Sequence, residues 1–207
     1  MGFDLYGLNP TENTEGPPIL SKFKDNDGWN NWEEMTKKDK DAYFKADSTY
    51  QEENPGIYFR ANVWWWRPIW IFVCYSCDFL SAKDCDKGGH NGGETISKTK
   101  SLRIASRLRK LDRTGVIDAW VNEYMKEYEK AKKHNKTVQK QLDKLQDEVK
   151  DKFGNDIVPS EYPEPYKTQW DAIYHEGMDW NASYPTSKNA IMQFANFCEQ
   201  SGGFKIC

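Results

Sequence analysis

The run Asn62-Val63-Trp64-Trp65-Trp66-Arg67-Pro68-Ile69-Trp70 places four indoles and a guanidinium within nine residues of an otherwise hydrophilic chain. Tryptophan side chains are large, flat and amphipathic, so they occur where a rigid surface is buried or offered to a partner. Three consecutive tryptophans cannot share one face of a helix or strand. The run is therefore either an ordinary core with one indole at its rim or an aromatic platform. A platform could stack a planar ligand or anchor another protein, with Arg67 as its charged partner.

Backbone preferences around this run predict a strand that leads into a helix. Residues 57–67 are expected to be extended, because a residue that precedes proline avoids the α region. Strand-like alternation would then place Trp64 and Trp66 on one side and Trp65 on the other. Pro68 suits the first turn of the helix that follows.

Helix start and stop signals recur on both sides of this segment. Thr36, with Asp39 three residues later, is typical of a capping box and begins a helix that Pro55 stops. Ser97 can cap a further helix that runs through Arg113.

The longest periodic pattern in the chain runs from residue 116 to residue 153. Its seam residues alternate in spacings of four and three: Ile117, Val121, Tyr124, Tyr128, Ala131, Asn135, Val138, Leu142, Leu145 and Val149. Five heptads of this kind predict a long helix with a narrow coiled-coil seam. The seam would be covered by a second copy of the chain, giving a possible homodimer, or by the Pro- and Tyr-rich segment 158–166 returning along it.

The two ends of the chain alternate as short strands, with Phe3 and Leu5 at one end and Phe204 and Ile206 at the other. Such short strands need a partner to be stable, so we expect them to pair with each other. A helix over residues 187–200 precedes the last strand. The predicted fold is mainly α (α+β). It is a single domain over residues 1–207, with a helical body, a small β element that pairs the terminal strands, and residues 116–153 as a protruding arm.

Composition narrows the class of protein. The 207 residues are 38% hydrophobic and 14% aromatic, which predicts one domain whose core is built from few, large side chains. The sequence has no apolar run of transmembrane length and no signal-peptide pattern, so we expect a cytoplasmic location and no membrane partner. Five cysteines at irregular spacing fit reduced thiols better than a disulfide framework.

Four potential zinc ligands follow one another in the middle of the chain: Cys74, Cys77, Cys85 and His90. Structural zinc needs four such ligands in a tetrahedral array, and a C-x2-C pair is a common start. Cys74, however, lies in an apolar run, where a cysteine usually serves as a small core residue. We therefore predict no cofactor and keep zinc as the alternative.

The helix predicted over residues 98–113 carries seven basic side chains against Asp112 alone. Its outward-facing stripe is expected to consist of Lys100, Arg103, Arg107 and Lys110. Such a stripe could hold nucleotide phosphates or single-stranded nucleic acid. Alternatively, it pairs with the protein's own acidic surface, such as Glu127, Glu129, Asp143 and Asp147. We favour the second interpretation, because the chain has a net charge of −3 and no nucleic-acid-binding motif.

Residues 83–94 contain four glycines and are expected to form a loop. This loop could cradle an anion ahead of the helix that Ser97 caps, although it matches neither the Walker nor the dinucleotide fingerprint. No histidine has a Ser or Cys nucleophile near it in sequence, so we name no catalytic residue. The predicted ligand-binding residues are Arg60, Asn62, Trp64, Trp65, Trp66, Arg67, His90 and Asn91.

Segments from both ends and the middle of the chain carry a family resemblance. They are Gly2-Phe3-Asp4-x-Tyr6-Gly7, Tyr58-Phe59-Arg60-x-Asn62-Val63-Trp64-Trp65-Trp66-Arg67-Pro68, His90-Asn91-x-Gly93, Tyr184-Pro185 and Ser201-Gly202-Gly203-Phe204-x-Ile206-Cys207. Together they resemble an uncharacterised family found in bacteriophages, marine phages among them, and in some bacteria. The resemblance covers most of the chain and is weakest over residues 125–165. Members often have Asn-Asp-Gly where this chain has Asn91-Gly92-Gly93, and they lack its cysteine spacing, which disfavours a catalytic loop and zinc.

The resemblance implies phage origin and an accessory role in the host cytoplasm, with no established activity to transfer. With the aromatic run, it predicts a non-enzymatic protein that binds a host component, either a nucleotide-like ligand or a host protein, through an aromatic and arginine surface. An enzyme that acts on a nucleotide-like substrate is the first alternative. A virion or assembly component that uses the heptad arm is the second.

Overall fold

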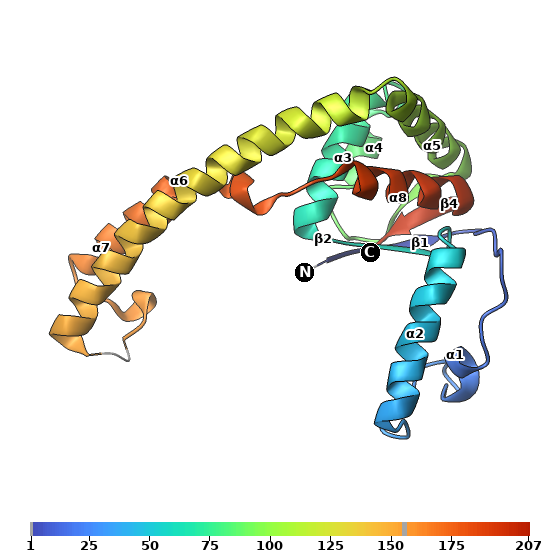
Figure 1. Ribbon diagram of the computed structural model, residues 1–207, viewed down its shortest axis with the longest axis horizontal. Helices are drawn as coiled ribbons and strands as arrows, with labels where there is room; N and C mark the ends of the chain where they lie inside the picture. The colour runs from blue at the N-terminus through green and yellow to red at the C-terminus, as the bar shows by residue number, and fades with distance from the viewer. Residues whose placement is uncertain (1, 155–156) are drawn as a thin grey trace. The chain divides into compact units, whose positions relative to one another are not determined.

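The computed structural model describes residues 2–154 and 157–207, which form two compact units. The first unit runs to Ile117 and resumes over Ser187–Cys207, and the second unit is Asp118–Thr186. The fold is mainly α with one small antiparallel sheet, as predicted (Figure 1).

The sheet belongs to the first unit and has the strand order β2-β1-β4-β3. Its strands are β1 (Gly2–Gly7), β2 (Tyr58–Asn62), β3 (Glu94–Ser97) and β4 (Gly203–Ile206). The pairing of the two chain ends is confirmed, with Leu5 opposite Ile206. The C-terminal strand is not an outer strand, however, because β3 pairs with its other edge.

Three helices form the core with the sheet: α3 (Val63–Ser76), α5 (Lys98–Arg113) and α8 (Lys188–Gln200). Alternate strand residues such as Leu5, Ile96 and Phe204 are fully buried. Their neighbours on the opposite sheet face, such as Tyr6 and Lys205, are exposed. This alternation places the core on one side of the sheet, as the period of two in a strand requires.

Helix α3 begins five residues earlier than predicted. The side chain of Asn62 accepts a hydrogen bond from the Trp65 backbone N–H at 3.0 Å, so Asn62 caps a helix that starts at Val63, and Pro68 lies inside it. A helix turns by about 100° per residue. The prediction that Trp64 and Trp66 share one side is therefore wrong. Trp66 is fully buried, whereas Trp64 and Trp65 are 43% and 37% exposed.

Residues 83–94, predicted to form a loop, include most of a short helix and the start of a strand. A capping box of Ser81 and Asp84 begins the short helix α4 (Ala82–Lys87), and the glycines that follow lead into β3 rather than directly into α5. Gly88 is packed against an indole, because a Cβ there would lie 2.0 Å from Nε1 of Trp70. The carbonyl of Gly88 also accepts a hydrogen bond from Trp66 Nε1 at 2.7 Å. Core packing against Trp70 therefore requires a glycine at position 88.

The remaining predicted helices of the first unit are confirmed. The capping box of Thr36 and Asp39 begins α2 (Lys37–Glu53), which packs with the short helix α1 (Ile19–Lys22). Ser97 caps α5, and Ser187 caps α8.

The second unit contains most of α6 (Val116–Phe153), the predicted heptad helix, which ends before Gly154. Five of its seam residues in the second unit are buried, namely Ala131, Val138, Leu142, Leu145 and Val149, and the other four there are half-buried. The chain then returns beside α6 (Figure 1) through η1 (Pro159–Glu161), α7 (Tyr166–Asp171), η2 (Ala172–Glu176) and η3 (Trp180–Ser183), and Gly177 of this returning segment packs against Val138. The seam is thus covered within one chain, which removes the exposed apolar stripe that suggested a homodimer. Although α6 is long, none of the described helices has the apolar stretch needed to cross a membrane.

Asn135, the polar seam residue, joins α6 to the returning segment. Its Nδ2 donates to the Asp179 carbonyl at 2.9 Å, and its Oδ1 accepts from the Asp179 N–H at 2.8 Å. We expect Asn135→Ala to destabilise the second unit by about 1–3 kcal/mol, because the backbone N–H and C=O of Asp179 both lose their partner. Hydrogen exchange of the Asp179 amide measures this. Gln139→Ala is the control, since the exposed side chain of Gln139 donates to Asp143 on the same helix. Unchanged exchange in Asn135→Ala would contradict the assignment.

Candidate binding cleft at the edge of the sheet

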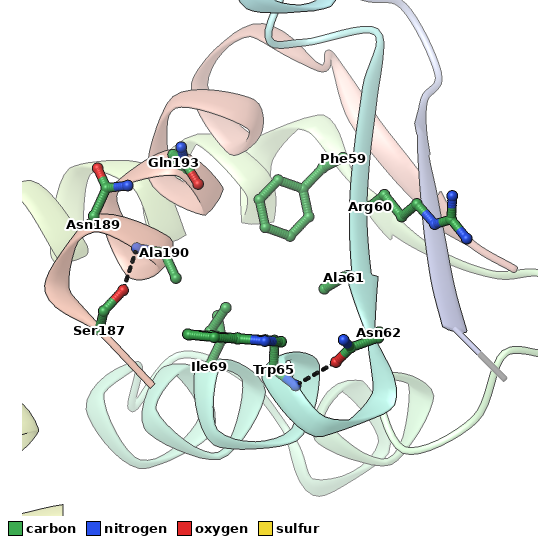
Figure 2. Close-up of a pocket in the computed structure, with 10 residues that line it drawn as sticks. All are labelled: Phe59, Arg60, Ala61, Asn62, Trp65, Ile69, Ser187, Asn189, Ala190 and Gln193. Carbon is green, nitrogen blue, oxygen red and sulfur yellow. Dashed lines mark hydrogen bonds between the residues drawn. The ribbon is translucent and has the colours of Figure 1, made fainter. Parts of the chain in front are cut away.

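An open cleft of about 530 Å³ lies in the first unit between β2, α3 and α8 (Figure 2). Its lining residues are Phe59, Arg60, Ala61, Asn62, Trp65, Ile69, Ser187, Asn189, Ala190 and Gln193. The volume is within the range of sites that bind small molecules, roughly 300–1,000 Å³.

Two helix caps shape this cleft. Asn62 turns the chain from β2 into α3, which brings the Trp65 ring over the cavity beside Ile69 (Figure 2). On the opposite wall, Ser187 Oγ accepts from the Ala190 N–H at 3.1 Å and begins α8.

The lining is apolar at its base and carries amides at its rim. Phe59, Ile69 and the Trp65 ring supply the apolar surface, and Asn189 and Gln193 supply carboxamides. Arg60 points away from the cavity in Figure 2 and contacts Asp4 on the exposed face of the sheet, so its backbone rather than its guanidinium lines the cleft. The described lining residues include no carboxylate, imidazole or thiol. This surface suits an uncharged apolar or aromatic group that also accepts or donates hydrogen bonds.

A second hollow of about 410 Å³ continues the cleft along β2. It shares Phe59, Arg60 and Gln193 with the first. Its other lining residues are Ser48, Gln51, Glu52, Pro55, Tyr58 and Asn196. The two hollows together follow most of the length of β2.

The structure divides the predicted ligand-binding residues among four places. Those that line the cleft are Arg60, Asn62 and Trp65. Trp66 belongs to the core, and Trp64 and Arg67 lie on an exposed face of α3, three residues apart. The remaining two, His90 and Asn91, lie in the exposed turn after α4 and do not line this cleft. The structure therefore does not bring these eight residues together on one surface.

Sequence reasoning missed the α8 wall of the cleft. Asn189 and Gln193 lie four residues apart, one helical turn, and beside the apolar residues Ile191 and Phe194 they mark the polar side of an amphipathic helix. That pattern identifies an exposed face. It carries no information that this face lies opposite Trp65, more than a hundred residues earlier.

The basic stripe of α5 is largely engaged within the first unit. Lys100 Nζ lies 2.6 and 2.7 Å from the two Asp84 carboxylate oxygens. Arg107 Nε donates to the Ser76 carbonyl at 2.8 Å, and Arg103 lies over the Phe79 ring at 4.0 Å. Lys110 is exposed. The stripe thus pairs within the first unit, with partners from α3, α4 and the segments next to them.

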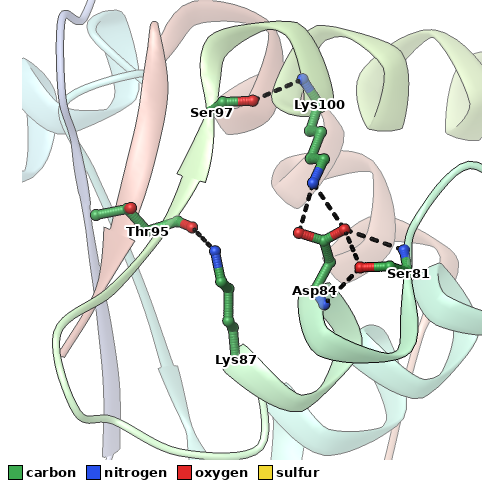
Figure 3. A network of polar contacts seen from close by, with 6 residues as sticks. All are labelled: Ser81, Asp84, Lys87, Thr95, Ser97 and Lys100. Carbon is green, nitrogen blue, oxygen red and sulfur yellow. Dashed lines mark hydrogen bonds and ion pairs between the residues drawn. The ribbon is translucent and has the colours of Figure 1, made fainter.

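Asp84 is the centre of this pairing (Figure 3). Its side chain is only 5% exposed, and it also accepts from Ser81 Oγ at 2.7 Å. The hydrogen bonds from Lys100 and then from Ser81 hold the pKa of Asp84 well below its usual range. The network ties α4 to α5 and has a structural role.

The four zinc candidates Cys74, Cys77, Cys85 and His90 do not form one site. Across residues 2–154 and 157–207, no three His, Cys, Asp or Glu side chains come together in a way that could hold a metal ion. All five cysteines are free thiols. Burial raises the pKa of Cys77 to about 12 and also raises the pKa of Cys74, so both are protonated thiols at neutral pH in the metal-free protein.

No protein-family model, curated protein or solved structure matches this chain. The chemistry of the cleft is therefore the basis of the functional proposal below.

Proposed function

We propose that this chain is a non-enzymatic binding protein that engages a host protein through the Trp65 cleft. The observation that carries the proposal is the partly exposed Trp65 indole, held beside an apolar cavity with amides at its rim. Residues that dominate the energy of protein interfaces are typically large aromatics next to such desolvated pockets.

A protein partner is favoured over a nucleotide-like ligand because phosphate groups need cations. The guanidinium of Arg60 is directed towards Asp4, away from the cavity. Two of the basic residues of α5, Lys100 and Arg107, have partners of their own. A planar base could still stack on Trp65, so nucleotide binding is the second outcome that an experiment must test.

Binding is favoured over catalysis by the same lining. General acid–base chemistry needs a titratable group within hydrogen-bond reach of the substrate. The side chains turned into the cavity are apolar groups, amides and a hydroxyl, and the Ser187 hydroxyl already caps α8.

The resemblance to bacteriophage proteins makes an infected bacterial cytoplasm the proposed setting, with an accessory role there. The alternative of a virion or assembly component would use the heptad arm. The burial of Leu142 and Leu145 within one chain leaves that arm less apolar surface for such contacts.

The proposal predicts that one host protein depends on Trp65 for retention. Wild-type protein, Trp65→Ala and Trp64→Ala are immobilised and exposed to a bacterial host extract, and the retained proteins are quantified by mass spectrometry. Trp64→Ala is the matched control, because Trp64 is slightly more exposed than Trp65 but lies outside the cleft. We expect a protein that wild type and Trp64→Ala retain and that falls about tenfold or more on Trp65→Ala. Equal retention on all three, or Trp65-dependent binding of ATP alone, would overturn the proposal.

A further inference from the structure

Strand β2 is an outer strand of the sheet, and it pairs with β1 only among the described strands. An outer strand presents a row of backbone N–H and C=O groups on its unpaired edge. Four consecutive residues of β2, 59–62, line the Trp65 cleft. In Figure 2 the cavity lies on one side of β2 and β1 on the other. The unpaired edge of β2 therefore faces the cleft.

Hydrogen-bond alternation identifies the backbone groups on this edge. The Gly7 N–H donates to the Ile57 carbonyl at 2.9 Å, and hydrogen-bonded pairs alternate with non-bonded pairs along an antiparallel ladder. The pair Asp4–Arg60, three residues further along, is therefore a non-bonded pair. Consistent with this, Asp4 exchanges both backbone hydrogen bonds with Cys207 instead, each 2.8 Å. The N–H and C=O of Arg60 thus point away from β1 and towards the cleft.

The space beside this edge has the form of a slot. Its base is the apolar surface of Phe59, Ile69 and Trp65, and its far wall is the amide-bearing face of α8. The two hollows continue one another along β2. The five residues of β2 span roughly 16 Å at about 3.3 Å per residue.

We propose that the cleft takes an extended, uncharged segment of the partner protein as a fifth strand beside β2. This inference rests on the proposed function and names the form of its partner. Backbone groups of the segment would bond with the N–H and C=O of Arg60. Alternate side chains, aromatic or aliphatic, would enter the apolar base beside Trp65, while those between them would lie on the sheet face that carries Tyr58 and Arg60.

An extended segment would use both the backbone edge of β2 and the apolar base of the cleft, whereas a flat ligand would use the base alone. A nucleobase on Trp65 would leave the hydrogen-bonding edge of β2 unused. A helix has no free backbone groups in its interior to offer that edge. The side chains turned into the first hollow are uncharged, so they give an acidic or basic segment no partner beside Trp65, and the second hollow adds the carboxylate of Glu52.

The first test uses peptides selected on the wild-type protein from a display library of random sequences. The tightest peptide is resynthesised with an N-methyl group at each residue in turn, which removes one N–H and leaves the side chain unchanged. Strand addition predicts that methylation at every second residue weakens binding by about tenfold or more, and that the intervening positions change it by less than about threefold. Isothermal titration calorimetry measures the affinities.

The second test changes the protein. Arg60→Pro removes the N–H that faces the cleft while keeping the bonds between β2 and β1, and an outer strand tolerates proline where its N–H is unpaired. Arg60→Ala is the matched control, because it removes the guanidinium and its contact with Asp4 but keeps the N–H. We expect peptide affinity to fall about tenfold or more in Arg60→Pro and to stay within about threefold in Arg60→Ala. If Arg60→Pro fails to fold, slowed hydrogen exchange of the Arg60 amide in the wild-type complex replaces it.

The outcomes separate this inference from the proposed function. Peptides that need Trp65 but show no alternation in the methyl scan would overturn strand addition and leave the proposed function standing. A dimer of the wild-type protein that Arg60→Pro abolishes would also overturn it, by assigning the edge of β2 to a second copy. No Trp65-dependent binding of any peptide or host protein would overturn both.

Discussion

Replacing Trp66 with alanine is expected to lower the free energy of unfolding of the first unit by about 3–5 kcal/mol, the usual cost of removing a buried indole. Trp66 is fully buried and stacks between Phe3 and Trp70, with ring centroids 5.7 and 5.2 Å away. Phe194 meets it edge to face at 5.3 Å. Its Nε1 also donates to the Gly88 carbonyl, which would lose its partner.

The neighbouring tryptophans provide the matched controls for this substitution. Trp64→Ala and Trp65→Ala remove the same side chain from partly exposed positions, so each should cost about 1 kcal/mol or less. Urea unfolding followed by circular dichroism measures all three variants. Equal losses in the three would show that the run acts only as core, and would remove the basis for assigning Trp65 to a binding site.

Replacing Asp84 with asparagine is expected to cost about 2–3 kcal/mol at neutral pH. Breaking a buried ion pair leaves the other charge uncompensated, which typically costs about 3–5 kcal/mol. The expected value is smaller here because the Lys100 side chain is 37% exposed and keeps some contact with water. Asp86→Asn is the control, since Asp86 lies on the same helix and its side chain is 79% exposed.

The stability difference between wild type and Asp84→Asn should depend on pH if the charge of Asp84 causes it. The folded-state pKa of Asp84 is lowered, chiefly by hydrogen bonds from Lys100, so its stabilisation is fully present above the usual carboxyl pKa, about 4. As the pH falls below that value, the unfolded chain binds the proton first and the stabilisation is lost. The gap between wild type and Asp84→Asn should therefore be constant above about pH 5 and shrink in acid. A gap that does not depend on pH would mean that packing, rather than charge, causes the loss.

Some elements of this protein were determined by short-range sequence signals alone. The Thr36–Asp39 capping box and the Ser97 and Ser187 caps set helix starts that the structure confirms. The heptads over residues 116–153 likewise predicted one long helix. These signals succeed because a cap or a periodic face involves atoms within a few residues of one another.

Errors arose where two local preferences competed. The extended preference expected ahead of Pro68 was outweighed by the Asn62 cap, which starts the helix at Val63. The glycines over residues 83–94 predict a loop, but the Ser81–Asp84 capping box just ahead of them begins α4. Strand β3 has only four residues and is held by pairing with β4, a partner more than a hundred residues away.

The sequence by itself determined which residues carry the chemistry: an indole-rich run, a basic helix, a heptad helix and two short terminal strands. Only the tertiary structure decided how each is used. It buries Trp66 and leaves Trp65 beside the amides of α8, it pairs Lys100 with Asp84, and it covers Leu142 with the chain's own returning segment. The physical reason is the same in each case. A side chain's type and spacing set what it can bind, whereas its partner is fixed by contacts between segments far apart in the chain, which no local pattern encodes.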